Sequence, residues 1–249
     1  MEGLADGKTA VKVNKALQLK RPRDVRFWIA MAVMIVAAAA FAVIARDVWE
    51  TAPILKQDMQ VSVWLHTHGS PVFSAFLFAI TQVHSTVGIP IRSLVVAYFL
   101  WRHGDRYWVL SLAVAVAGGL LLNVILKFVF HRDRPTWDDP ILSLASSSFP
   151  SGHTAGATLF YGFLAAYMVW RMKKPAARVL VVVACAFMVA LVGFSRIYLG
   201  VHFLSDVLAA ISMSTVWLVV SLVTVRAYAK RRSGSATPGA PAPAPDPAT

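Results

Sequence analysis

The stretch FWIAMAVMIVAAAAFAVIA, residues 27–45, carries no charged side chain and decides the class of fold. A helix needs roughly 20 apolar residues to cross the hydrocarbon core of a bilayer, so this stretch is long enough for one span. A cleaved signal peptide is the rival interpretation, because Ala42 and Ala45 form a small-residue pattern. The apolar region of a signal peptide usually stops at about 15 residues. The stretch therefore predicts a retained membrane anchor.

Four further apolar runs predict spans over 108–126, 154–170, 179–194 and 203–225. The stretch 71–101 is too long for one simple span, and polar or helix-breaking residues interrupt it at His84, Gly88, Pro90 and Arg92. We interpret 72–83 as an interfacial or re-entrant helix and 85–101 as a further span, with His84 at the membrane interface. The expected fold is all-α, a polytopic membrane helix bundle with six transmembrane spans.

The composition agrees with a membrane protein. The chain is 57% hydrophobic and 14% charged, and its mean hydropathy is +0.62. Its formal net charge is +12, but the cations form short clusters between apolar runs, which suits an anionic membrane surface better than nucleic acid. The single cysteine, Cys185, lies within an apolar run and cannot form an intrachain disulfide.

The distribution of cations predicts the orientation in the membrane. Of the 24 Lys and Arg residues, 17 lie in four segments on one predicted side: 1–26, 102–107, 171–178 and 226–232. Cytoplasmic loops carry the excess of Lys and Arg, so both termini are expected in the cytoplasm. We expect three parts: a basic cytoplasmic tail over 1–26, the six-span domain over 27–228, and a disordered Pro/Ala-rich tail over 229–249.

Three polar motifs lie at the opposite, outer ends of the predicted spans. Lys127 ends the third span and is separated by six residues from Arg134-Pro135. FPSGHT, from Phe149, opens the fourth span, and SRIYLGVHFLSD, residues 195–206, joins the fifth span to the sixth. Because all three motifs lie at one membrane face, they can converge in one site. That face is expected to be the periplasmic or outer side of the cytoplasmic membrane.

The residue types in these motifs suit a phosphate group. Lys127, Arg134 and Arg196 supply three cations, and a guanidinium can bind two phosphate oxygens at once. Ser151 and Gly152 lie where a helix begins, and the unpaired backbone amides of a helix start favour an anion. We therefore expect these five residues to bind phosphate.

The same motifs contain candidates for the chemistry. His202 and Asp206 are four residues apart, on one face of a helix, so Asp206 can accept from one imidazole nitrogen. The other nitrogen is then free to attack phosphorus, and His153 is left to protonate the leaving oxygen. The carboxylates expected near the site are few: Asp133, Asp138, Asp139 and Asp206. A Mg²⁺-dependent mechanism is therefore disfavoured, and we expect neither metal nor cofactor.

The pattern K-x6-RP, PSGH and SR-x5-H-x3-D resembles the three-part signature of the type 2 phosphatidic acid phosphatase family. That family includes membrane lipid phosphatases and is related to the vanadium haloperoxidases. The resemblance covers residues 127 to 206 with no departure at a signature position. It implies a phosphohistidine intermediate on His202, acid–base catalysis by His153, and independence from metal ions.

Each residue also has a structural interpretation. Lys127 and Arg134 could be cations at the membrane edge whose side chains reach the headgroups, and His202 with Asp206 could be a structural pair. Arg92 is costly within a span and is a candidate for contact with the substrate. His131 is a second such candidate, because it lies inside the first motif but outside its fixed positions.

We expect an enzyme that hydrolyses a phosphate monoester or pyrophosphate of a lipid. Undecaprenyl diphosphate is the first choice of substrate, because the site faces outward, where that carrier is released; this rests on family analogy. Phosphatidylglycerophosphate, phosphatidate and the lipid A phosphates are the other candidates. A lipid phosphotransferase with the same site is the alternative, and a lipid transporter is less favoured because there is no inverted repeat. The expected partners are the lipid substrate and the membrane, with no nucleic acid and no obligate protein partner.

Overall fold

A computed structural model describes residues 25–50, 54–137 and 146–234. Every regular element in these ranges is a helix, which confirms the all-helical prediction. In chain order the helices are α2 (Val25–Trp49), α3 (Ile54–Thr67), α4 (Pro71–Val83), α5 (Gly88–Arg102), α6 (Arg106–Phe130), α7 (Gly152–Arg171), α8 (Pro175–Tyr198) and α9 (Leu204–Gly234). Most of the two predicted tails, 1–24 and 235–249, lies outside the described residues.

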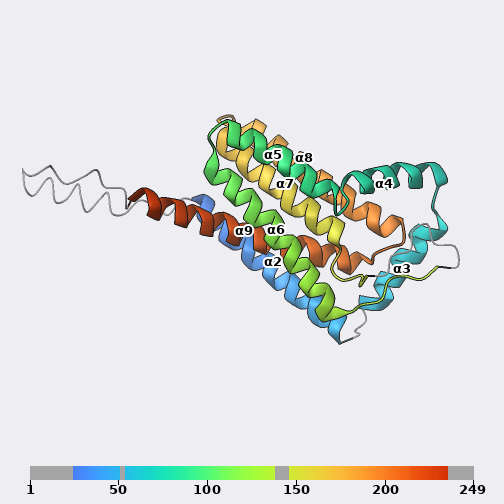
Figure 1. Cartoon of the computed structure of the whole chain (residues 1–249). Helices are drawn as coiled ribbons and strands as arrows, with labels where there is room; N and C mark the ends of the chain where they lie inside the picture. The colour runs from blue at the N-terminus through green and yellow to red at the C-terminus, as the bar shows by residue number, and fades with distance from the viewer. Residues whose placement is uncertain (1–24, 51–53, 138–145, 235–249) are drawn as a thin grey trace, which may run out of the picture.

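Helix α7 lies inside the bundle, in contact with α5, α6, α8 and α9 (Figure 1). Its Leu159 and Phe163 are fully buried. Two glycines of α6 allow the neighbouring helices to approach closely. A Cβ atom at Gly118 would lie 2.4 Å from the indole ring of Trp217 in α9, and one at Gly119 would lie 2.5 Å from Leu159. Small residues of this kind let helices pack where side chains would hold them apart.

Four of the described helices are long and apolar enough to cross a membrane: α2, α6, α8 and α9. Helices α4 and α5 pass the same test only as a pair, which is bent by 51° at the break that the sequence predicted between them. Helix α7 does not pass this test by itself, and its sequence includes polar or small residues such as His153, Thr154 and Gly156. Length and hydropathy thus give four or five spans over the residues described, and six remains a prediction.

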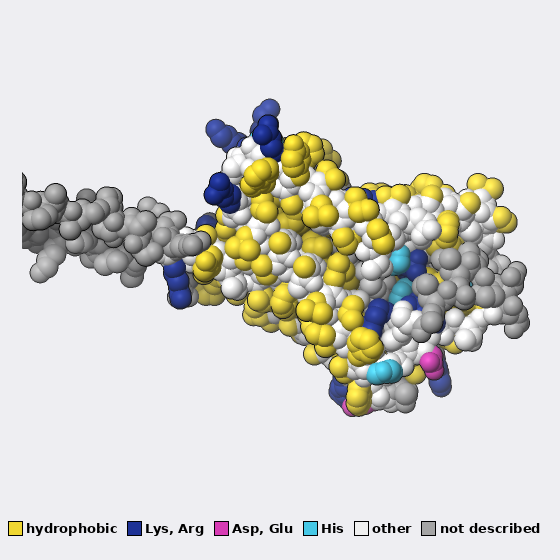
Figure 2. Space-filling model, in the orientation of Figure 1, with side chains coloured by type: hydrophobic (Ala, Val, Ile, Leu, Met, Phe, Trp, Pro, Cys, Tyr) yellow, Lys and Arg dark blue, Asp and Glu magenta, His cyan; other side chains and the backbone are white. Residues whose placement is uncertain are grey.

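The cationic turns lie together at one end of the bundle. The hydroxyl of Tyr167 donates to the carboxylate of Asp105 at 2.8 Å, and the rings of Trp108 and Trp170 lie 5.5 Å apart. These contacts join the α5–α6 turn to the α7–α8 turn. Figure 2 shows Lys and Arg side chains at this end of the visible face, histidines with further Lys and Arg toward the other end, and hydrophobic side chains between them. The side of the membrane that each end faces stays a prediction.

Candidate active site

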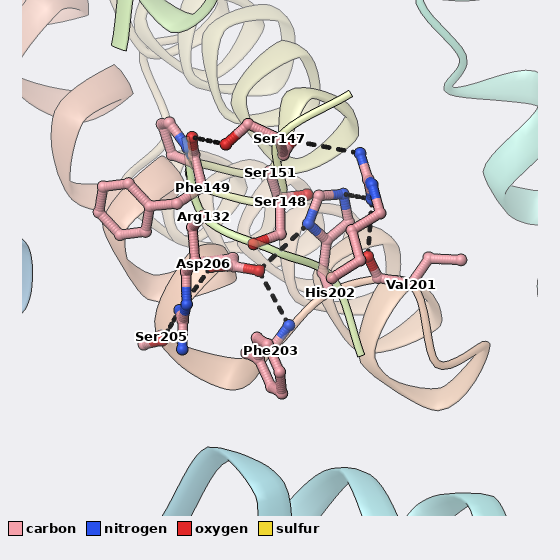
Figure 3. Close-up of polar contacts among 12 residues, drawn as sticks. Arg132, Ser147, Ser148, Phe149, Ser151, Val201, His202, Phe203, Ser205 and Asp206 are labelled. Carbon is pink, nitrogen blue, oxygen red and sulfur yellow. Dashed lines mark hydrogen bonds and ion pairs between the residues drawn. The ribbon is translucent and has the colours of Figure 1, made fainter. Parts of the chain in front are cut away.

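Three segments that are distant in the sequence meet where α6 and α8 end and where α7 and α9 begin (Figures 1 and 3). The backbone amide of Ser151 donates to the carbonyl of Asp206 at 3.1 Å and joins the start of α7 to α9. The Nη1 atom of Arg134 donates to the carbonyl of Val201 at 2.7 Å and joins the α6–α7 segment to the α8–α9 corner. The three sequence motifs thus lie in one place.

His202 is the buried centre of this site, with 2% of its surface exposed. Its Nδ1 lies 3.3 Å from Oδ2 of Asp206, and its Nε2 lies 3.3 Å from Nη1 of Arg134 (Figure 3). A guanidinium has only donors, so Nε2 must be the acceptor and the ring proton must be on Nδ1. The imidazole therefore turns an unprotonated nitrogen toward the cations and its N–H toward the carboxylate.

The surroundings of His202 keep its imidazole neutral. Burial lowers the pKa of His202 well below its usual value of 6.5, and the charges of Arg196, Arg134 and Lys127 lower this pKa further. Burial also lowers the pKa of the Arg134 guanidinium, while Asp206 raises it. An arginine still carries its charge at neutral pH. The site therefore combines fixed cations with an uncharged nucleophilic nitrogen.

The three predicted phosphate-binding cations bond mainly to neutral oxygens. Lys127 Nζ and Arg134 Nη2 both donate to the carbonyl of Ser147, the latter at 3.3 Å. Arg196 is buried, and its Nη1 donates to the hydroxyl of Thr81 in α4 at 2.7 Å. The Nε of Arg196 is also buried and has no hydrogen-bond partner among the described residues. Because neutral oxygens hold these cations, most of their positive charge is left for an anion.

The start of α7 differs in one detail from the expected anion site. Ser151 is the N-cap of α7, but its amide is already bonded to the carbonyl of Asp206. The amide of Ala155 makes the first bond of the helix, to the carbonyl of Ser151 at 2.9 Å. The amides from Gly152 onward therefore remain as the helix-start donors. A Cβ atom at Gly152 would lie 3.4 Å from the Asn123 side-chain oxygen, so the approach there is close.

The remaining predicted residues are spread more widely. His153 is partly buried in the first turn of α7. Arg92 lies in α5 beside Tyr161 of α7, and its Nη1 is buried without a hydrogen-bond partner among the described residues. A ring nitrogen of His84 lies 2.8 Å from the same Tyr161 hydroxyl, and His84 is 2% exposed, so its side chain packs inside the protein. Its expected place at the membrane interface stays a prediction. His131 ends α6 in the left-handed conformation, with an exposed side chain.

The carboxylates around the site also differ from those expected. Asp138 and Asp139 lie outside the described residues, and Asp133 is exposed. A carboxylate that the sequence did not indicate, Asp58 of α3, is buried beside the site. Arg132 bridges this carboxylate to Asp206.

Two residues that hold no fixed motif position thus belong to the site, Asp58 and Arg132. Arg132 was visible as a second arginine two positions before Arg134. Asp58 gave no signal, because only the packing of α3 against α9 brings it there.

Residues 108–230, about half of the chain and including all three motifs, match the model of the PAP2 superfamily. The chain belongs to this superfamily. The predicted family is thereby confirmed. Phosphatidylglycerophosphatase B of Bacillus subtilis is 40% identical over 94 residues, which cover 37% of this PAP2 chain and 46% of that protein. Undecaprenyl-diphosphatase BcrC of the same organism is 29% identical over 165 residues, covering 64% and 80%. The chain spans about half the length of the first curated relatives that it matches.

A solved structure shows the same fold. The crystal structure of a transmembrane PAP2-type phosphatidylglycerolphosphate phosphatase from Bacillus subtilis superposes with a TM-score of 0.67. The superposition covers 81% of this PAP2 chain and 96% of the other, at 23% identity. The helix arrangement is thus shared.

Proposed function

We propose that this PAP2 chain is an integral membrane enzyme that hydrolyses a phosphate monoester or pyrophosphate of a lipid. The observation that carries the proposal is the orientation of His202. Its unprotonated Nε2 faces Arg134, and its Nδ1–H faces Asp206. A phosphate held by the cations would place phosphorus beside Nε2, which is the geometry of a nucleophile. The apolar helices make a membrane lipid the substrate that reaches this site.

Undecaprenyl diphosphate is the first choice of substrate. Support comes from the name of one relative, an undecaprenyl-diphosphatase that matches over 64% of this chain. Phosphatidylglycerophosphate follows, because the other relative described above is a phosphatidylglycerophosphatase. Phosphatidate and the lipid A phosphates complete the set.

The proposed reaction has two steps. In the first, Nε2 of His202 forms a bond to phosphorus while the bond from phosphorus to the leaving oxygen breaks, and His153 gives that oxygen a proton. In the second, water attacks the phosphohistidine, His153 takes its proton, and the N–P bond breaks to release inorganic phosphate. Asp206 stabilises the positive charge that develops on the imidazole.

Three side chains supply the charge that phosphoryl transfer needs. Lys127, Arg134 and Arg196 can neutralise the phosphate oxygens, and the amides at the start of α7 can add donors. On this basis we propose a mechanism that is independent of metal ions.

Arg92 and His131 are proposed as further contacts with the substrate. The buried, unpartnered Nη1 of Arg92 supports the first, because such a donor suits a second phosphate or a polar headgroup. The exposed position of His131 suits only a contact at the rim of the site.

We also propose that the site faces the periplasm or the outside, with both termini in the cytoplasm. The two cationic turns at the other end of the bundle support this orientation, because cytoplasmic loops carry the excess of Lys and Arg.

Phosphate release from a panel of these lipids, with a chelator present, tests the proposed function. Purified protein should release inorganic phosphate from at least one lipid and keep its activity in the chelator. Phosphate that appears on an acceptor molecule instead would indicate a phosphotransferase. Loss of activity in the chelator, restored by added metal, would overturn the metal-independent mechanism.

Arg92→Gln, measured with the same panel of lipids, should lower the rate of phosphate release from diphosphate substrates more than from monophosphates.

On its acidic side the pH profile of the activity should have a midpoint below 6.5, and on its basic side the activity should fall as His153 loses the proton that it gives to the leaving oxygen. The acidic midpoint is expected because neutral His202 is the reactive form, and its pKa lies below the usual value of 6.5 in the folded protein. The profile of kcat/KM should be measured from about pH 4 to about pH 8. The phosphate of the substrate titrates near pH 6 as well. Profiles measured with two substrates whose phosphates have different pKa values separate the two titrations, because a midpoint set by His202 is the same for both substrates. A shared acidic midpoint above 6.5 would contradict the assignment.

A further inference from the structure

A buried arginine joins two carboxylates behind the proposed nucleophile. Nη1 of Arg132 lies 2.7 Å from Oδ1 of Asp206, and its Nη2 lies 2.8 Å from Oδ2 of Asp58. The exposed fractions of these side chains are 8% for Arg132, 3% for Asp58 and 0% for Asp206. Charged side chains are rarely buried without a partner of opposite charge, and here each of the three has one.

We propose that Arg132 and Asp58 are positioning residues, which act through Asp206 to hold His202 in its reactive tautomer and orientation. The inference rests on the proposed function of His202 as the nucleophile. It goes beyond that proposal, because neither residue stands at a fixed position of the three motifs.

The two oxygens of the Asp206 carboxylate have different partners. Its Oδ1 accepts from Arg132, while its Oδ2 faces Nδ1 of His202 and accepts from the amide of Phe203 at 3.0 Å (Figure 3). With both oxygens engaged, the carboxylate cannot rotate about its terminal bond. Oδ2 is therefore held where it accepts from the Nδ1–H tautomer, which leaves Nε2 unprotonated.

Asp58 changes the net charge behind His202. Arg132 alone would neutralise Asp206 and would oppose a positive charge on the imidazole during phosphoryl transfer. Asp58 adds a second negative charge on the far side of the guanidinium. The three groups then carry one net negative charge behind His202, which favours the cationic imidazole that forms when Nε2 attacks phosphorus.

Asp58 also connects α3 to the start of α9 through two hydrogen bonds. Oδ1 of Asp58 accepts from the amide of Ser205 at 2.9 Å, and Oδ2 accepts from the Ser205 hydroxyl. Ser205 is in the first turn of α9, so Asp58 binds an amide that the helix itself leaves unpaired. The guanidinium carbon of Arg132 also lies 4.4 Å from the centre of the Phe203 ring. Helix α3 is thus fixed to the turn that carries Asp206.

The geometry requires an arginine. A planar guanidinium can donate to two carboxylates at once from different nitrogens, whereas a lysine presents a single ammonium group. Arg132→Lys should therefore keep the charge but lose the bridge, and its activity should be closer to that of Arg132→Gln than to wild type.

Kinetics of Arg132→Gln and Asp58→Asn test the inference. Each change should lower kcat by about 10–100-fold, with KM changed less than about threefold. The double variant should lose little more than either single variant, because both act through the same contact. Addition of ethylguanidinium should restore part of the activity of Arg132→Ala. Arg46→Gln is the matched control, since Arg46 pairs with Glu50 at 3.2 Å in an exposed position and should leave kcat unchanged.

A second measurement does not depend on turnover. In protein labelled with ¹⁵N-histidine, the nitrogen chemical shifts report which ring nitrogen of His202 carries the proton, and His202→Gln identifies its signals. Wild type should show Nδ1–H, and Arg132→Gln should show a mixture of tautomers. An unchanged tautomer, together with a kcat loss no larger than the loss of folded protein, would overturn the inference. If wild type released phosphate from no lipid, the proposed function would fail, while the tautomer would still test the positioning role.

Discussion

Replacing His202 by alanine is expected to lower phosphate release by at least about 10⁴-fold, because a residue that forms the covalent intermediate has no substitute in the site. His202→Gln, which retains a polar side chain of similar length, should be equally inactive. Its expected inactivity separates the loss of the nucleophile from the loss of packing around a buried ring. Initial rates of phosphate release from the most reactive lipid of the panel provide the measurement.

His103→Ala is the matched control for this experiment. His103 is exposed at the other end of the bundle, where its ring nitrogen lies 2.7 Å from the carbonyl of Phe99. Its removal should leave the rate within about twofold of wild type, since surface substitutions away from special features have small effects. A His202→Ala protein that is folded and retains more than a few per cent of wild-type activity would rule out His202 as the nucleophile.

His153→Gln is expected to slow the hydrolysis of lipid substrates by about 10²–10⁴-fold, because a lipid alkoxide is a poor leaving group without a proton donor. An aryl phosphate with a stable phenolate leaving group needs no such donor in the first step. With p-nitrophenyl phosphate the variant should therefore release a burst of about one phenolate per protein, followed by slow turnover. Stopped-flow absorbance measures both phases.

The burst distinguishes the two steps that His153 is proposed to serve. Loss of the burst, together with equal slowing of lipid and aryl substrates, would show that His153 binds or positions the phosphate and does not transfer a proton. The His103→Ala protein serves again as a control, and it should resemble wild type with both substrates.

Much of the fold could be predicted because apolar runs of sufficient length record lipid contact directly. The break between α4 and α5 was also visible, since polar and helix-breaking residues interrupt that stretch. Helix α7 is the exception: its neighbours in the bundle replace lipid on its buried face, so threonine and glycine are accepted there and its hydropathy is lower. Hydropathy therefore describes the lipid-facing helices better than the central one.

The site was predictable where its residues lie close together in the sequence. The four-residue spacing of His202 and Asp206 indicates one helix face, and the structure places their side chains 3.3 Å apart. Contacts between distant helices left no such pattern. Asp58 reaches the site only through the packing of α3, and Thr81 bonds Arg196 only because α4 lies against α8.

Identification of the phosphorylated residue tests the central claim most directly. The His153→Gln protein, which should accumulate the intermediate, is mixed with p-nitrophenyl phosphate, quenched in base and digested for mass spectrometry. The account predicts a phosphoryl group on His202 that is stable in base and labile in acid, and that is absent from the protein with both His153→Gln and His202→Ala. A phosphoryl group on another residue, or phenolate release with no phosphorylated protein, would contradict it.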